Sequence, residues 1–373
     1  MKQMKIIFQK DELTEALQAT QRGISNKNTI PHLNGFFIQT HSDNTLSIIT
    51  YDLEMGINYY LSTEILEQGS VVVPTKFFDI IKKLPEDQIT FSVDQENYLI
   101  TIESGQVYYE IKGLDPEEYP KLPEIEEGKS FSIPEILLKK MIHQTSFAVS
   151  KEETKPAFTG VLCKFDSDNK LDMVATDSYR LAWRKGKISN DSQISGEYII
   201  PQKAIGQVQR IISEEDKLIN LYLANGYFLC ETEKVRLFSK LIDEEFPNLD
   251  QVIPKNYQTK VMIDRKFLQD SMERASLLAS EGANNIVKLN ISEENMEITS
   301  NSPHTGKLKE DLQLYKEGDN ISIALNARFI IEVLKVIEED QVELEFTGSY
   351  SPMIIRPREN DQYFHLILPV RAF

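Results

Sequence analysis

The sequence predicts an α+β fold made of three tandem copies of one unit, each with two helices packed on antiparallel sheet. Three segments align without gaps, and each follows an apolar strand-like run, has apolar residues at helical spacing and ends in serine: 8–25, 133–150 and 263–280. A second strand-then-helix pattern recurs once in every copy, at 71–84, 198–212 and 321–337. Such repeats indicate one supersecondary unit used several times. We therefore expect six half-units in a curved or ring-like layout.

The first two copies keep one register over a long stretch. An offset of 125 residues aligns Pro31 with Pro156 and Asp52 with Asp177, and further on the offset becomes 127. The third copy is more diverged. Residues 89–93, 98–102 and 107–111 alternate between apolar and polar, which predicts an antiparallel meander.

Domain boundaries are expected where proline and acidic residues cluster without periodicity, at 114–128 and 242–258. These stretches divide the chain into three predicted domains, 1–125, 129–253 and 256–373. Asn225-Gly226 lies inside the second domain and is a typical hairpin turn.

Composition excludes several classes of protein. The 373 residues include 41 Lys+Arg and 58 Asp+Glu, a net charge of −17, and 41% are hydrophobic, which is typical of a globular acidic protein and not of a disordered one. Cys163 and Cys230 are too few for a disulfide framework. The first ten residues lack a secretory apolar core, and no run of 18 apolar residues occurs. We expect a cytoplasmic protein with no membrane partner.

Charge is segregated between the predicted helices and the rest of the chain. The helical segments 9–22, 134–151, 264–276, 74–84, 201–212 and 325–337 hold 15 basic and 9 acidic residues, a net charge of +6, which leaves −23 for the remainder. A positive helix layer beside acidic strands and loops suits a protein that faces a polyanion on one side and repels it elsewhere. No base-reading motif occurs, so binding to nucleic acid would use the backbone and be independent of sequence.

Signals of catalysis are few. The five histidines show neither His-x-x-x-His spacing nor neighbouring cysteines, and no phosphate-binding glycine loop or nucleophile elbow occurs. We expect no metal and no cofactor. The best enzymatic candidate is Thr176-Asp177-Ser178 at the end of an apolar strand, which leaves open an α+β hydrolase or transferase using Asp177 and Ser178. The other interpretation is a strand-end turn in which Asp177 caps backbone amides.

Three signatures together resemble the bacterial sliding clamps, the beta subunits of DNA polymerase III. They are the run from Ala175 to Ala182 (ATDSYRLA), the Phe246-Pro247 step and the ending Leu368-Pro369-Val370-Arg371. The resemblance covers the whole chain. It implies a head-to-tail homodimer that closes as a six-domain ring with the helices inside, and a DNA polymerase processivity factor with no catalysis of its own.

Partners follow from the same resemblance. They are double-stranded DNA, a second copy of this chain, the replicative polymerase alpha subunit, the clamp loader, and other polymerases and repair proteins that carry clamp-binding peptides. The implied peptide pocket comprises Phe158, Thr176, Ser178, Tyr179, Arg180, Leu181, Pro247, Val252, Leu366, Ile367, Leu368, Pro369, Val370 and Arg371. Arg180 and Arg371 are expected at its rim, facing acidic or carbonyl groups.

The implied DNA contacts are Lys27, Lys76, Lys151, Lys203 and Arg210. Three positions depart from the pattern of the family: Gln251 stands where a basic residue is frequent, Tyr179 where histidine is frequent, and Glu152 where a polar DNA contact is expected. For the dimer interface we expect large apolar residues near the ends of the repeats, which are Tyr109, Ile111, Leu277 and Leu278.

Overall fold

The computed structural model describes residues 3–24, 29–123, 128–166, 168–189, 193–249, 251–280 and 285–370. They group into two compact units: unit 1 holds residues within 1–135 and 207–241, and unit 2 holds those within 136–189, 193–206 and 242–373. The middle repeat is thus divided between the units. Each unit contains two antiparallel sheets.

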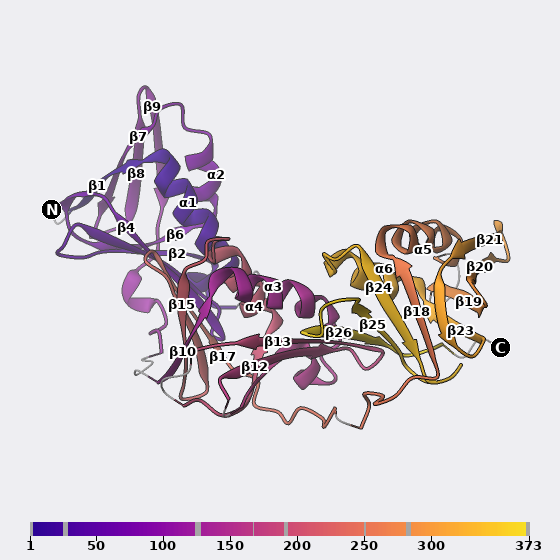
Figure 1. Cartoon of the computed structure of the whole chain (residues 1–373). Coiled ribbons are helices and arrows are strands. Elements are labelled where there is room, and N and C mark those ends of the chain that lie inside the picture. The colour runs from indigo at the N-terminus through magenta and orange to yellow at the C-terminus, as the bar shows by residue number, and fades with distance from the viewer. Residues whose placement is uncertain are drawn as a thin grey trace. The chain divides into compact units, whose positions relative to one another are not determined.

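The first sheet of unit 1 has the strand order β5-β1-β7-β8-β9. Its strands are β1 (Gln3–Gln9), β5 (Glu64–Glu67), β7 (Gln88–Asp94), β8 (Leu99–Ser104) and β9 (Val107–Lys112). The predicted meander is therefore confirmed, and β9 is an edge strand. Two helices belong to the same repeat, α1 (Lys10–Thr20) and α2 (Lys76–Lys82), which pack side by side (Figure 1).

The second sheet of unit 1 has the order β10-β15-β16-β17-β4-β3-β2-β6 and joins two repeats. Its strands are β2 (Gly35–Thr40), β3 (Thr45–Tyr51), β4 (Met55–Ser62), β6 (Ser70–Pro74), β10 (Lys129–Pro134), β15 (Leu218–Ala224), β16 (Tyr227–Glu231) and β17 (Val235–Lys240). The junction is the antiparallel pair β17–β4, with Leu237 opposite Ile57. The predicted hairpin is confirmed, since Asn225 and Gly226 connect β15 to β16 with φ of 50° and 79°.

Unit 2 contains a sheet with the order β14-β11-β12-β13-β26-β25-β24-β18-β22, which joins the second repeat to the third. Its strands are β11 (Gly160–Phe165), β12 (Lys170–Thr176), β13 (Arg180–Lys187), β14 (Gly196–Pro201), β18 (Thr259–Asp264), β22 (Tyr315–Gly318), β24 (Gln341–Phe346), β25 (Met353–Pro357) and β26 (Tyr363–Ile367). At the junction of β13 with β26, Leu181 lies opposite Leu366.

The other sheet of unit 2 has the order β21-β20-β19-β23. Its strands are β19 (Ile286–Ser292), β20 (Asn295–Ser302), β21 (Gly306–Gln313) and β23 (Ile321–Asn326), and β21 is an edge strand. Helix α5 (Arg265–Ala279) packs on β20 and β21 and against α6 (Ala327–Val336). The side chains of Asp264 and Asn326 cap the two helices by accepting the backbone N–H of Phe267 and Arg328, both at 2.9 Å.

The two remaining helices, α3 (Glu135–Thr145) and α4 (Gln202–Ile211), belong to the middle repeat. All six α-helices in the described part of the chain therefore begin within the predicted strand-then-helix segments. Their amphipathic spacing buries one face; in α1 that face is Leu13, Ala16, Leu17 and Thr20. Among the described residues, no helix is both long and apolar enough to cross a membrane.

Candidate functional site

The turn between β12 and β13 is held by its own side chains. Asp177 Oδ1 accepts the backbone N–H groups of Tyr179 and Arg180, both at 3.0 Å, and Thr176 Oγ1 donates to the Arg180 carbonyl at 2.6 Å. Ser178 has a φ of 78°, in the left-handed region. Its hydroxyl oxygen accepts a hydrogen bond from Lys155 Nζ at 3.2 Å. The carboxylate that a hydrolase or transferase would use is therefore committed to the turn, and the capping interpretation holds.

Arg180 points into the interior of unit 2. Its Nε donates to Asp177 Oδ2 at 3.0 Å, its Nη1 to Glu332 on α6, and its Nη2 to the Phe147 carbonyl at 2.9 Å. The guanidinium carbon also lies 4.5 Å from the centre of the Phe329 ring. Arg180 was expected at the rim of the pocket, but in the structure its donors are taken up inside the protein; Arg371 lies outside the described residues.

His365 is buried close to Arg180. The imidazole is fully buried, 5.6 Å from the ring of Phe147 and 5.8 Å from that of Tyr363, measured between ring centres. Burial, and after it the positive charge of Arg180, lower the pKa of His365 to about 3. This histidine is therefore uncharged in the folded chain.

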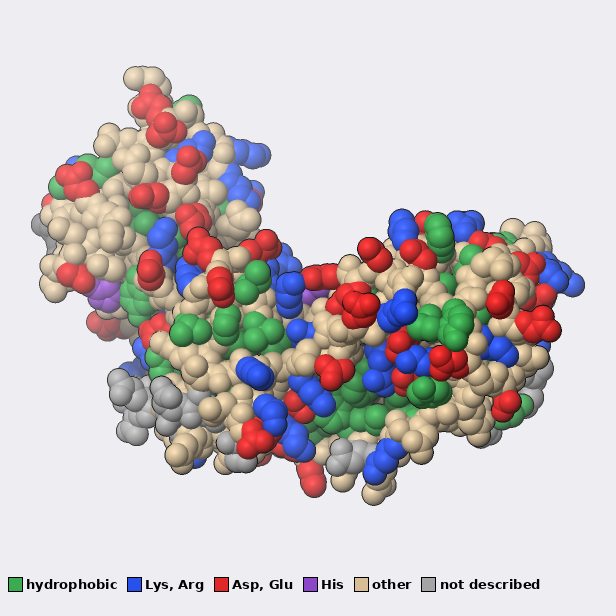
Figure 2. Space-filling model, in the orientation of Figure 1, with side chains coloured by type: hydrophobic (Ala, Val, Ile, Leu, Met, Phe, Trp, Pro, Cys, Tyr) green, Lys and Arg blue, Asp and Glu red, His purple; other side chains and the backbone are tan. Residues whose placement is uncertain are grey.

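Several predicted pocket residues do come together in one apolar cluster. Leu181, Phe246 and Leu366 are buried in it, and Phe158 and Leu368 pack against them half-exposed. The Phe158 and Phe246 rings meet edge to face with centres 5.7 Å apart. The strand β13, the end of β26 and the segment around Phe246 therefore form one apolar surface, which we call the cleft. Figure 2 shows hydrophobic side chains gathered on this face of unit 2, below β13 and β26, with Lys and Arg side chains beside them.

Other pocket residues take different positions. Ile367 is fully buried in the separate core beneath α5 and α6, because alternate residues of β26 face opposite sides of the sheet. Its side chain therefore faces away from the cleft. Tyr179 and Val252 are exposed, at 64% and 43%, as is Pro247. The chain after β26 is anchored by backbone hydrogen bonds, from Leu368 N–H to the Tyr179 carbonyl and from Val370 N–H to the Ala324 carbonyl, both at 2.8 Å. Pro369, between these two residues, is half-buried.

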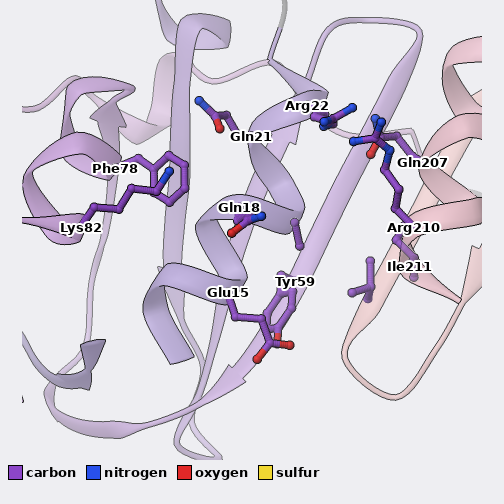
Figure 3. Close-up of a pocket in the computed structure, with 12 residues that line it drawn as sticks. Glu15, Gln18, Gln21, Arg22, Tyr59, Phe78, Lys82, Gln207, Arg210 and Ile211 are labelled. Carbon is purple, nitrogen blue, oxygen red and sulfur yellow. The ribbon is translucent and has the colours of Figure 1, made fainter. Parts of the chain in front are cut away.

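A second candidate site is a basic cavity of about 550 Å³ in unit 1 (Figure 3). Three cationic side chains line it from separate elements: Arg22 follows α1, Lys82 ends α2, and Arg210 lies near the end of α4. Gln18, Gln21 and Gln207 add amide groups, and Figure 3 shows Gln207 beside Arg22 and Arg210.

The carboxylate of this cavity has partners of its own. Glu15 Oε1 accepts the hydroxyl of Tyr59 at 3.0 Å and lies 3.9 Å from Lys234 Nζ. Lys82 Nζ lies 3.7 Å from the centre of the Phe78 ring, which positions the ammonium without neutralising it. The cavity therefore presents excess positive charge and hydrogen-bond donors, which suits phosphate groups.

Among the described residues that were predicted to contact DNA, only Arg210 lines this cavity. Lys76 is exposed at the start of α2 and pairs with Asp79 at 3.4 Å, while Lys151 and Lys203 are exposed elsewhere. Lys27 lies outside the described residues. Sequence reasoning did not single out Arg22 and Lys82. Helical spacing could have found Arg22, because Glu15, Gln18 and Arg22 recur at intervals of three and four residues.

The residues expected at the dimer interface lie near sheet edges. Tyr109 is 40% exposed and Ile111 half-buried on the edge strand β9. Leu277 is 72% exposed and Leu278 half-buried near the end of α5, the helix that packs on edge strand β21. In the part of the chain that the structure describes, no three His, Cys, Asp or Glu side chains cluster as a metal site would need.

Comparison with known proteins covers the whole chain. Models of the DNA polymerase III beta subunit match its N-terminal domain at residues 4–123, its central domain at 132–248 and its C-terminal domain at 250–371. The chain is 36% identical over 381 residues to the beta sliding clamp of Bacillus subtilis (strain 168), covering 99% of this chain and 100% of that protein. The beta sliding clamp of Staphylococcus aureus (strain N315) is also 36% identical, over 385 residues, with the same coverage.

Solved structures agree. The DNA polymerase sliding clamp from Bacillus subtilis superposes with a TM-score of 0.94 at 36% identity, over 99% of this chain and 100% of that one. A sliding clamp from Pseudomonas aeruginosa bound to griselimycin superposes with a TM-score of 0.93 at 26% identity and the same coverage.

Proposed function

The chain belongs to the DNA polymerase III beta-subunit family of sliding clamps, and we propose that two copies close head to tail into a ring around duplex DNA. It is a DNA polymerase processivity factor, an accessory subunit and not a catalytic one. The observation that carries this conclusion is the similarity over 99% of the chain to a DNA polymerase sliding clamp, with a TM-score of 0.94. As a replication factor, it would act in the bacterial cytoplasm.

The basic cavity supports a loose contact with the DNA backbone. Arg22, Lys82 and Arg210 offer three cations to phosphate groups, whereas the chain as a whole carries a charge of −17. A small number of phosphate contacts, together with repulsion of the DNA by the acidic rest of the chain, gives weak and salt-dependent binding that allows sliding. Retention on DNA would then be topological.

Two exposed strand edges support closure of the ring. β9 in unit 1 and β21 in unit 2 each pair on one side only, so each offers unpaired N–H and C=O groups. Pairing β9 of one chain with β21 of another would satisfy both edges. It would also cover the apolar side chains of Tyr109 and Leu277.

The cleft supports docking of short peptides. Apolar anchors of a partner would meet Phe158, Leu181, Leu366 and Leu368, which already form one cluster. Two such anchors contribute about 1.5–3 kcal/mol each, and after the ordering cost of a flexible peptide the dissociation constant should be about micromolar. The replicative polymerase, the clamp loader, and other polymerases and repair proteins would share this cleft.

Topology of the DNA provides the test. Chain loaded by a clamp loader onto nicked circular DNA should remain bound at about 0.15 M salt, where screening acts within about 8 Å. Linearising the same DNA should release it within minutes. Equal retention on both forms would show adhesion to the backbone and contradict the ring.

A further inference from the structure

A hollow with apolar side chains at its floor and polar ones at its rim lies beside the cleft on the same face of the nine-stranded sheet in unit 2. Its volume is about 220 Å³, and its lining includes Leu162, Val174, Trp183, Phe246 and Leu249. Small-molecule pockets usually measure about 300–1,000 Å³. The hollow is smaller than that and suits one large side chain.

The strand register makes the hollow continuous with the cleft. Leu162 of β11 lies opposite Val174 of β12, and Val174 lies opposite Trp183 of β13, so these three side chains form one row across the sheet. Leu181 is two residues from Trp183 on β13 and lies opposite Leu366 in the cleft. Rows two residues apart share a face and are about 7 Å apart. A peptide in the cleft can therefore reach the hollow with its next one or two residues.

Phe246 borders both the hollow and the cleft. The Phe246 side chain lines the hollow, and its ring meets that of Phe158 in the cleft in an edge-to-face contact. Pro247 follows it, exposed, and also lines the hollow. A peptide that crosses these two residues from the cleft would place its next side chain in the hollow.

The rim of the hollow is acidic. Lys164 and Glu197 lie on it and pair with each other at 2.9 Å, so their charges cancel. Glu245 also lies on the rim and, within the described part of the chain, makes no ion pair or hydrogen bond. It follows two further exposed carboxylates, Asp243 and Glu244. A cation beside the apolar side chain would complement this rim.

We propose that the hollow is a specificity pocket for the clamp-binding peptides of partner proteins, taking a large aliphatic or aromatic side chain that stands next to a lysine or arginine just outside the core motif. This inference rests on the proposed use of the cleft. It predicts that partners differ in affinity according to this flanking pair of residues. Glu245 would select the basic residue, and the row from Leu162 to Trp183 would hold the apolar one.

Trp183 gives a direct readout, because it is the one tryptophan in the sequence and lines the hollow half-buried. The probes are tryptophan-free peptides: a core Ser-Leu-Leu-Phe, and the same core extended at either end by Gly-Leu-Lys, Gly-Leu-Glu or Gly-Ala-Ser. Affinity is measured by fluorescence anisotropy and occupancy of the hollow by Trp183 emission. At one of the two ends of the core, the Gly-Leu-Lys extension should make the peptide bind about tenfold more tightly than the Gly-Ala-Ser extension does. It should also shift the Trp183 emission to the blue.

Two charge variants refine the test. Glu245→Lys should abolish most of the gain from Gly-Leu-Lys and favour Gly-Leu-Glu, while the core peptide binds as before. Glu244→Lys changes the neighbouring carboxylate, which does not line the hollow, and should keep at least half of the gain. Equal affinities for all extensions with unchanged Trp183 emission, while the core still binds, would overturn the pocket and leave the cleft intact.

A separate probe covers the case in which the core peptide fails to bind. N-acetyl-Leu-Lys-amide at millimolar concentration should shift the Trp183 emission saturably in the unmodified dimer and much less in Glu245→Lys. Absence of any shift would overturn the inference whatever the fate of the cleft. Loss of core binding alone would contradict the proposed function only.

Discussion

Arg180 and Glu332 form an ion pair that fastens the turn after β12 to helix α6 in unit 2. The two side chains are 10% and 26% exposed, and Arg180 also bonds Asp177 and the Phe147 carbonyl. Burial alone would raise the pKa of Glu332, but hydrogen bonds from Arg328 and Arg180 hold it below its ordinary value. The turn therefore keeps its conformation through a contact 152 residues away in the sequence.

Breaking this pair should destabilise unit 2. Glu332→Gln removes one of the two carboxylates that pair with the buried Arg180 guanidinium and leaves only that of Asp177, which should cost about 2–4 kcal/mol of unfolding free energy. Glu338→Gln is the matched control, since its pair with Lys140 is exposed and should be worth less than about 1 kcal/mol. Urea unfolding of both variants measures the difference. Equal losses would mean that Arg180 is stabilised by its other partners alone.

The cleft should lose peptide affinity when its terminal segment is trimmed. Leu368→Ala with Pro369→Ala removes apolar surface beside Leu181 and Leu366, and binding of a polymerase tail peptide should weaken about tenfold or more. The double variant should melt close to the unmodified chain, because both residues are only half-buried. Leu218→Ala, at an exposed leucine of unit 1, is the control. Unchanged anisotropy titrations with a preserved melting temperature would disprove the assignment of the cleft.

The basic cavity should set the salt dependence of DNA contact. Replacing Arg22, Lys82 and Arg210 by alanine removes up to three phosphate contacts, so the slope of log K against log salt should fall by about 3. Lys121, Lys187 and Lys307, which are exposed and outside the cavity, provide a control with the same loss of charge. Short linear duplexes at low salt suffice for the measurement. Identical slopes for the two triple variants would place the DNA contact elsewhere.

Acid should destabilise the chain through His365. The folded chain keeps this imidazole neutral down to about pH 3, whereas the unfolded chain protonates it below its ordinary pKa of 6.5. Between these two pH values the unfolded state binds one more proton than the folded state. The contribution of His365 to the free energy of unfolding is therefore complete above pH 6.5 and falls by about 1.4 kcal/mol per pH unit as the pH drops.

Replacing His365 by a residue of similar size should flatten this profile. In His365→Leu the free energy of unfolding should decline less between pH 6.5 and 4.5 than in the unmodified chain. His143→Leu, at an exposed histidine, should keep the original slope. Parallel profiles for all three proteins would mean that other groups govern the acid response.

The dimer should depend on the end of α5. Leu277→Ala with Leu278→Ala should produce monomers at nanomolar concentration, because two leucines packed in the interface contribute roughly 4–10 kcal/mol. Phe267→Ala removes a larger exposed side chain near the beginning of the same helix and should leave the dimer intact. Sedimentation velocity separates the two states, and a double variant that stays dimeric would disprove this part of the interface.

Local patterns in the sequence predicted the elements well, and contacts between distant segments account for what they missed. The predicted segment 71–84 contains all of α2 and all but the first residue of β6, because strand alternation and helical spacing are properties of neighbouring residues. The burial of Arg180 depends on Glu332 and Phe329 of α6, which no local pattern connects with the turn. Ile367 was assigned to the pocket with its neighbours because the resemblance gave a run of residues and not the face of the strand.

The basic cavity also depends on contacts between segments that are distant in the sequence. Arg22, Lys82 and Arg210 lie in three helical regions whose approach depends on tertiary packing. The total charge of the predicted helices indicated a positive surface. It did not indicate which Lys and Arg side chains would line one cavity. The pairing of β17 with β4 could not be predicted from the sequence either. The two strands are more than 170 residues apart and form hydrogen bonds with each other only once both repeats have folded.

The β17–β4 ladder makes the first and second repeats depend on each other. A polypeptide cut between the first and second repeats would leave β4 with bare amide and carbonyl groups along the edge where β17 now lies, and such edges capture strands from other molecules. A gene shortened at this point should therefore encode an aggregation-prone product.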